Sequence, residues 1–210
     1  MELSPDDPAV PMFPLGRVLL PFEILPLHVF EPRYRALVRD VLDTSGEFGV
    51  VLIERGREVG GGDIRFDVGT LARIVRVERV PDGRFGLVTV GVRRVRVREW
   101  QSDDPYPRAV VEPFAEPALG PDAEAAVPRV AARLAEVAAL ARQFDPRVAD
   151  PPSLADDPVR ASWEAAAIAP LGPLDAQRVL ETESAEARLA VLEALLAEHA
   201  AALRFRLGPG

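Results

Sequence analysis

The chain has 210 residues, of which 48% are apolar and 28% charged, values typical of a protein that buries a core. It contains no cysteine, all 25 of its basic residues are arginines, and it has only two histidines. Disulfides, thiolate metal sites, cysteine nucleophiles, Schiff-base chemistry and the phosphate-loop lysine of nucleotide hydrolases are therefore excluded, while the net charge of −8 disfavours nucleic-acid binding.

The composition changes near residue 115. Residues 1–115 contain 5 alanines and 10 of the 13 aromatic residues, whereas residues 116–210 contain 26 alanines and 3 aromatic residues. Aromatic and β-branched residues favour strands, and alanine and leucine favour helices. We therefore expect a β-rich domain over residues 1–115 and an Ala/Leu-rich helical domain over residues 116–210.

The first domain is expected to hold six short strands and one early helix. The apolar residues between Tyr34 and Leu42 have the i, i+3, i+4, i+7 and i+8 spacing of an amphipathic helix, and Pro32 suits its first position. The expected strands are residues 10–13, 48–53, 71–80, 85–90, 92–100 and 109–114. These elements predict a small, mostly antiparallel barrel or sandwich.

The second domain is expected to be an α-helical bundle. Helices are predicted within residues 122–144, 158–169 and 175–181, and a last helix is predicted after the N-cap Ser184. Asp157 precedes a proline, as an N-cap precedes proline at the first helical position. The last helix has one apolar stripe, in which the histidine is interpreted as a boundary residue: Leu189, Leu192, Leu196, His199 and Leu203.

Few residues are candidates for chemistry. His28 could shuttle a proton or make a polar contact, but a half-buried histidine bonded to the backbone or to Glu31 is the preferred interpretation. Glycines 60–62 are interpreted as a hairpin tip rather than a phosphate cradle, and the arginines of residues 93–98 as a solvated strand face rather than a nucleic-acid stripe. No catalytic residue, metal site or cofactor is predicted.

Proline-rich stretches at residues 11–15, 20–22 and 25–27 are unusual, because proline removes a donor from a strand ladder. These stretches must be edge strands or irregular extended backbone. Apolar side chains on such a stiffened backbone would form a groove for another chain at low ordering cost, or they would simply cover the end of the barrel. Both interpretations stay open.

The same segment carries a family resemblance. Residues 13–21 (FPLGRVLLP) and 25–34 (LPLHVFEPRY) strongly resemble the N-terminal, substrate-binding domain of Lon proteases, and residues 48–53, 68–74 and 81–83 recur in matching order. The resemblance implies an α+β fold, in which a PUA-like β pseudo-barrel with one amphipathic helix is followed by an α-helical bundle. It also implies the gripping of unfolded or tagged polypeptides. No ATPase or serine–lysine protease module matches, so the chain is interpreted as a stand-alone family member.

We therefore expect a non-enzymatic polypeptide-binding protein with a substrate-recognition or adaptor role in protein quality control. Its groove is expected to form from the proline-rich segment and the start of the first helix. There, aromatic rings would supply apolar contact, Arg33 would bind a carboxylate or a carbonyl, and His28 would form a polar edge. The expected site residues are Phe22, Leu27, His28, Phe30, Arg33 and Tyr34.

Two alternatives stay open. Because PUA-like barrels elsewhere serve nucleic acids, the chain could be a small-ligand or RNA-binding module, although its net charge disfavours RNA. A hydrolase that uses serine, histidine and an acid is the least favoured, because no serine lies in a Gly-x-Ser-x-Gly elbow.

The expected partners are unfolded or extended polypeptide segments, and whether a separate protease or chaperone also binds is left open. The sequence shows no signal peptide and no apolar run near the roughly 20 residues that a bilayer span needs. A cytoplasmic protein without a membrane partner is expected.

Overall fold

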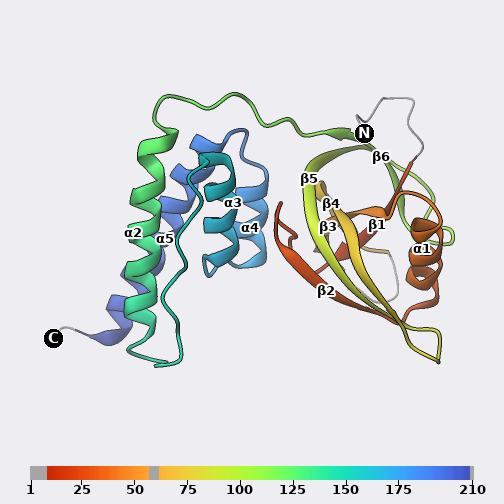
Figure 1. The fold of residues 1–210 in the computed structure, drawn as a ribbon, viewed down its shortest axis with the longest axis horizontal. Helices are drawn as coiled ribbons and strands as arrows, with labels where there is room; N and C mark the ends of the chain where they lie inside the picture. Colours follow the sequence, from red (N-terminus) through yellow and green to blue (C-terminus); the bar gives the residue numbers. More distant parts are fainter. Residues whose placement is uncertain (1–8, 57–61, 209–210) are drawn as a thin grey trace. The chain divides into compact units, whose positions relative to one another are not determined.

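The structure of the chain is a computed structural model that describes residues 9–56 and 62–208. The chain divides into two compact units, residues 1–115 and 116–210. In the described ranges, the first unit holds six strands and one helix and the second holds four helices (Figure 1). The α+β class expected from the sequence is confirmed. None of the described helices is long and apolar enough to cross a membrane.

All strands described in the first unit belong to one mixed sheet. They are β1 (Val10–Leu15), β2 (Ile24–Val29), β3 (Glu47–Arg55), β4 (Ile64–Arg79), β5 (Phe85–Trp100) and β6 (Arg108–Pro113). Their order is β2-β5-β4-β3-β1-β6, with β1 and β3 parallel and the other neighbours antiparallel. The parallel pair places the first strand of the chain next to the strand that follows the helix.

The sheet closes on itself through β5. The first part of β5, up to Val90, pairs with β2, and its last part, from Val95, pairs with β6, while β4 lies along its other side. Strands β5, β4, β3, β1 and β6 therefore form a closed ring, and β2 is an edge strand attached to β5. Register shifts, such as the one between Val97 and Glu99, let the long strands bend around the ring.

Gly91 lies where β5 changes its partner from β2 to β6. The segment that precedes β2 crosses β5 here, since Phe22 N donates to Gly91 O at 2.8 Å and Gly91 N donates to Glu23 O at 2.9 Å. A Cβ at this position would lie 2.2 Å from the carbonyl oxygen of Leu20. A glycine is required for this close approach, and it fixes where β2 begins.

The structure corrects several strand predictions. The strands expected at 85–90 and 92–100 are one strand, because Gly91 continues the pairing with β4 instead of ending it. Strand β4 begins at Ile64, before the expected start at residue 71. Of the proline-rich stretches, residues 25–27 lie in an edge strand, β2, as expected, but the expectation is wrong for residues 11–15, which lie in β1 between β3 and β6. The hairpin tip predicted at glycines 60–62 lies, apart from Gly62, outside the described residues.

The predicted amphipathic helix is confirmed as α1 (Pro32–Leu42), which packs against the ring (Figure 1). Its buried face is Tyr34, Leu37, Val38 and Val41. These residues share a core cluster with Phe13 of β1, whereas the neighbouring Met12 belongs to a second cluster between the strands. Successive side chains of a strand point to opposite faces, so β1 joins both clusters.

The second unit contains α2 (Ala123–Ala141), α3 (Pro158–Ile168), α4 (Pro173–Leu180) and α5 (Ala185–Leu207). Helix α5 packs along α2 and contacts α3 and α4. Both predicted caps are confirmed, since the side chain of Asp157 accepts from Arg160 N and the side chain of Ser184 accepts from Ala187 N. These caps fix where α3 and α5 begin.

The stripe predicted for α5 is buried in its first half. Leu189, Leu192 and Leu196 are buried, but His199 is exposed, so its interpretation as a boundary residue is wrong. A stripe of seven-residue period drifts by about 20° per heptad on a straight helix. Ala200 therefore faces the core where the pattern placed His199.

Candidate functional site

The outer face of β2 and its flanking residues leaves apolar side chains uncovered. Ile24 is 65% exposed and Phe30 is 55% exposed, whereas Leu25 and Val29 are buried, as alternation along a strand requires. Phe22, just before the strand, is 49% exposed. We refer to the exposed residues together as the β2 stripe: Phe22, Ile24, Pro26, His28 and Phe30.

Phe22 has a strained backbone. Its φ of +67° lies in the left-handed region, which bulky residues rarely adopt. Two hydrogen bonds hold the turn, one from Phe22 N to Gly91 O at 2.8 Å and one from Glu23 N to Leu20 O at 3.2 Å. The surrounding backbone thus holds Phe22 in a costly conformation that leaves its ring half exposed.

A hollow of about 210 Å³ lies between the end of β2, strand β1 and the start of α1. We refer to it as the β2 hollow. His28 and Glu31 are the polar residues among those that line it, and the other lining residues are apolar or aromatic: Phe13, Leu15, Pro26, Leu27, Val29, Phe30 and Tyr34. The rings of Phe13 and Tyr34 stack at 4.1 Å between centroids, which gives the hollow a packed wall.

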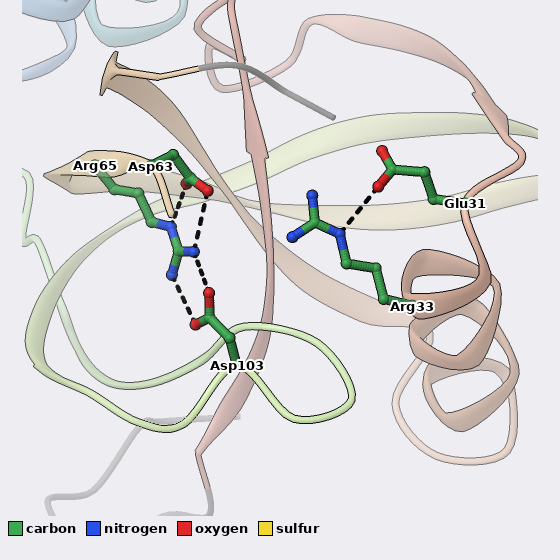
Figure 2. A network of polar contacts seen from close by, with 5 residues as sticks. All are labelled: Glu31, Arg33, Asp63, Arg65 and Asp103. Carbon is green, nitrogen blue, oxygen red and sulfur yellow. Dashed lines mark hydrogen bonds and ion pairs between the residues drawn. The ribbon is translucent and has the colours of Figure 1, made fainter. Parts of the chain in front are cut away.

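An ion pair supports this wall at the start of α1. The guanidinium of Arg33 lies 4.4 Å from the ring centroid of Tyr34. Figure 2 shows the ion pair of Arg33, whose Nε donates to Glu31 Oε2 at 3.1 Å. The hydroxyl of Tyr34 is enclosed and has no hydrogen-bond partner within residues 9–56 and 62–208. Burial raises the pKa of Tyr34 well above its ordinary value, so the phenol stays neutral.

The structure brings four of the six predicted site residues together around the β2 hollow: Leu27, His28, Phe30 and Tyr34. Arg33 lies beside them with its guanidinium bonded to Glu31, and Phe22 lies at the opposite end of β2. The expected set is therefore spread along one strand and the helix start that follows it.

His28 is exposed, so the prediction of a half-buried histidine bonded to the backbone or to Glu31 is wrong. Alternation along β2 places Val29 inside and His28 outside, and Glu31 accepts from Arg33 instead. Sequence reasoning also missed Ile24, because residues 24–30 are apolar at every position except His28, and no alternation in the sequence marks the exposed face.

A second hollow, of about 190 Å³, adjoins the β2 hollow. Residues 28–30 line both of them. The far wall of the second hollow is formed by Val80, Arg84 and Phe85 at the turn between β4 and β5. The end of β2 thus borders hollows on two sides.

Unlike the apolar hollows at the end of β2, a cluster around Arg65 consists of paired charges (Figure 2). The guanidinium of Arg65 binds Asp63 and Asp103, each with a contact of 2.5 Å, and lies 4.8 Å from the ring centroid of Trp100. Burial acts to raise the pKa of Asp63, but the hydrogen bonds from Arg65 and from a backbone N–H, together with the charges of Arg65 and Arg33, outweigh it and hold that pKa below its ordinary value. This cluster, the Arg65 network, joins the start of β4 to the loop after β5.

The arginines of residues 93–98 are also engaged within the fold. Arg94 is buried with its guanidinium 4.1 Å from the ring of Phe114, so the expectation of a solvated face is wrong for this residue. Arg96 and Arg98 are exposed, and Arg98 pairs with Glu112 at 2.5 Å. Within the described ranges, no three histidine, aspartate or glutamate side chains are grouped so that they could hold a metal ion.

Comparison with known proteins gives one consistent result. A family model described as the ATP-dependent protease La (LON) substrate-binding domain matches residues 9–198. Lon protease 2 of Sorangium cellulosum (strain So ce56) is 30% identical over 214 residues, which cover 97% of this chain and 26% of that protein. The Lon protease of Desulfovibrio desulfuricans is 30% identical over 201 residues, 93% of this chain and 22% of that protein. The chain thus spans about a quarter of the length of the curated relatives it matches.

Two solved structures resemble most of the chain. A Lon N-terminal domain protein from Xanthomonas campestris has a TM-score of 0.65 and 29% sequence identity, covering 90% of this chain and 98% of that one. The N-terminal domain of the Mycobacterium avium complex Lon protease has a TM-score of 0.68 and 21% identity, covering 91% of this chain and 100% of that one, a likeness of fold alone.

Proposed function

The chain belongs to the family of Lon protease substrate-binding domains, and on this premise we propose that it binds extended, apolar polypeptide segments without changing them chemically. The binding site is the β2 stripe together with the β2 hollow. The observation that carries this proposal is a run of uncovered apolar side chains beside a hollow with packed walls. Exposed apolar patches of this kind are typical of sites that receive protein partners.

The size of the β2 hollow favours a polypeptide over a small-molecule ligand. Pockets for cofactors and drug-sized ligands usually measure about 300–1,000 Å³. The β2 hollow measures about 210 Å³ and is continued by an open strand face rather than by an enclosing lid. It suits one apolar side chain of a longer chain whose neighbouring residues lie along the β2 stripe.

The predicted site residues take different parts in this proposal. Phe22, Leu27 and Phe30 provide apolar contact, and His28 provides a polar edge. Arg33 and Tyr34 support the wall of the hollow, because the arginine is already paired and the tyrosine ring is already buried. This differs from the expected role of Arg33 as a partner for a carboxylate of the bound chain.

The expected affinity is modest. Burial of one large apolar side chain contributes about 1.5–3 kcal/mol, and association itself costs several kcal/mol. A few such contacts give weak binding that tolerates many sequences. Such binding suits a protein that must recognise many unfolded chains.

The names of the relatives suggest where such binding is used. They are Lon proteases, and the matching family model is described as their substrate-binding domain. We propose that this chain likewise selects polypeptides for protein quality control, in a substrate-recognition or adaptor role. It holds the polypeptide, and any cleavage is performed by other protein modules.

Fluorescence anisotropy with a labelled, permanently unfolded polypeptide tests the site. Phe30→Ala should weaken binding roughly tenfold, equivalent to about 1.4 kcal/mol of lost apolar contact. Phe205→Ala is the matched control, because Phe205 is 87% exposed on the second unit and should leave the affinity unchanged. Unchanged binding by Phe30→Ala would overturn the site, and a lack of binding by the unaltered protein would overturn the function.

The same assay also tests the alternative that the chain is an RNA-binding module. Single-stranded RNA is titrated at about 50 mM and about 300 mM salt, because binding to phosphates weakens steeply with salt. We expect no salt-dependent RNA binding at concentrations where the polypeptide binds. If RNA binding weakens with salt and no polypeptide binding is seen, the chain is an RNA-binding module and the present proposal is overturned.

A further inference from the structure

A third hollow, of about 390 Å³, lies between the end of α1 and the turn between β4 and β5. Leu42, Val80 and Phe85 give it an apolar lining. The other described lining residues are Gly83, three exposed arginines and one acidic residue: Arg39, Arg79, Arg84 and Asp43. We refer to this hollow as the arginine hollow.

Positive charge exceeds negative charge in the arginine hollow. Arg84 pairs with Asp82 at 2.6 Å, but the two side chains are 57% and 50% exposed, and exposed pairs of this kind bind weakly. Arg35 adds a further cation, since its guanidinium lies against Gly83, where a Cβ would be 2.2 Å from Nη2. Among the described residues around the hollow, the positive charges of four arginines are therefore opposed by only two acids, Asp43 and Asp82. This local excess contrasts with the net charge of −8 of the whole chain.

The arginine hollow adjoins the site of the proposed function through shared lining residues. The second hollow shares residues 28–30 with the β2 hollow, and it shares Val80, Arg84 and Phe85 with the arginine hollow. The three hollows thus follow one another around the end of β2 and the β4–β5 turn. A polypeptide that fills the β2 hollow advances about 3.3 Å per extended residue, which brings its following residues toward the arginines.

We propose that this site prefers apolar segments flanked by acidic side chains, whose carboxylates bind Arg39, Arg79 and Arg84. The inference rests on the proposed function, because it names the substrate class of the same site. A guanidinium matches a carboxylate through two parallel N–H···O bonds, and the charge excess favours an anionic partner. A phosphate-rich chain would match the arginines but would leave the β2 stripe uncovered.

The test uses labelled peptides that share one apolar core and an amidated C-terminus. The core is flanked on both sides by glutamates, by glutamines or by arginines. We expect the unaltered protein to bind the glutamate peptide roughly three- to tenfold more tightly than the glutamine peptide, and the arginine peptide least tightly. This preference should shrink at about 300 mM salt, because salt screens exposed charges.

A double variant, Arg39→Gln with Arg79→Gln, assigns the preference to the arginine hollow. It should lose most of the preference for the glutamate peptide, because only Arg84 and Arg35 remain and Arg84 is paired with Asp82, while the affinity for the glutamine peptide stays unchanged. Arg147→Gln is the matched control, because Arg147 is 90% exposed and belongs to the second unit. This control should keep the full preference for glutamate.

The outcomes separate this inference from the proposed function. Equal binding of the glutamate and glutamine peptides by the unaltered protein overturns the inference alone, whereas no binding of any peptide overturns both. A preference that is undiminished in the double variant also overturns the inference, because the carboxylates then bind elsewhere. A glutamine peptide with a free C-terminus completes the set. If it alone binds tightly, the arginine hollow takes a terminal carboxylate, and acidic side chains are not its ligands.

Discussion

The start of α1, which adjoins the β2 stripe, and the Arg65 network are built from the same kinds of side chain, and Figure 2 shows the polar contacts of both. Each combines an arginine, a neighbouring acid and an aromatic ring, namely Arg33 with Glu31 and Tyr34, or Arg65 with Asp63 and Trp100. The side chains of Arg65 and Asp63 are only 8% and 2% exposed. Beside Arg33, by contrast, Phe30 is 55% exposed.

This difference separates stability from binding. A charge that is bonded within the chain and covered by a ring contributes to the fold, and its loss leaves a buried partner unpaired. An uncovered apolar ring contributes little to the fold but gains free energy when a partner covers it. Changes in the Arg65 network should therefore alter stability, and changes in the β2 stripe should alter affinity.

The largest expected effect is that of Arg65→Met. It leaves Asp63 buried without its partner, so the free energy of unfolding should fall by about 3 kcal/mol, measured by urea denaturation. Adding Asp63→Asn should recover part of the loss, because the unpaired charge is then removed. Polypeptide affinity of the folded variant should not change. A decrease in the free energy of unfolding below about 1 kcal/mol would show that the network contributes little to stability.

Gly91→Ala should affect both properties, because Gly91 fixes where β2 begins. A Cβ 2.2 Å from the carbonyl oxygen of Leu20 forces the backbone apart, and such overpacking costs about 1–3 kcal/mol. Polypeptide affinity should fall as well, since the β2 stripe moves. Gly172→Ala is the control, with no atom within 4 Å of its Cβ, and should leave the affinity unchanged. Equal effects of the two variants would contradict the role of Gly91.

A smaller effect is expected for Tyr106, which makes the free energy of unfolding depend on pH in the alkaline range. Burial, with a hydrogen bond to Asp40 at 2.6 Å, raises the pKa of Tyr106 from 10.0 to about 12. Between these values the folded protein keeps the proton that the unfolded chain has lost, so the free energy of unfolding falls as pH rises from 10 to 12. Tyr106→Phe should flatten this fall in urea denaturation over that range. An unchanged slope would show that Tyr106 does not cause it.

The smallest expected effect is that of Phe22→Gly. Glycine accepts a φ of +67° without strain, so stability should rise by about 0.5–1 kcal/mol, while polypeptide affinity should fall a few-fold with the loss of the ring. Gly46→Ala provides the reverse control, because Gly46 has a φ of +70° in open space and should lose about 1 kcal/mol. A variant that gains stability and keeps its affinity would remove Phe22 from the site.

Local patterns allowed much of the fold to be predicted from the sequence. Helix α1 follows from the spacing of apolar residues behind Pro32, and the starts of α3 and α5 follow from Asp157 and Ser184. In each case the residues that decide the structure lie within one or two turns of each other. Such signals do not depend on which distant segments meet.

What could not be predicted depends on distant segments. Gly91 reads as a break between two strands until the crossing at Leu20 is known. Arg65 and Asp103 are far apart in the chain, and no short pattern connects them. Arg94 is buried because Phe114 covers it, which the alternation of β5 does not reveal. The place of the candidate site was predicted from the proline-rich segment together with the family resemblance, whereas its hollows depend on tertiary packing.

Pro26 has a consequence for how the molecule behaves at high concentration. An edge strand with apolar side chains can template strands from other copies, which leads to aggregation. Pro26 offers no N–H, so the row of donors along β2 is interrupted and a second copy cannot add a regular strand there. A polypeptide held at this strand contributes side chains but no continuous ladder, so it can dissociate readily.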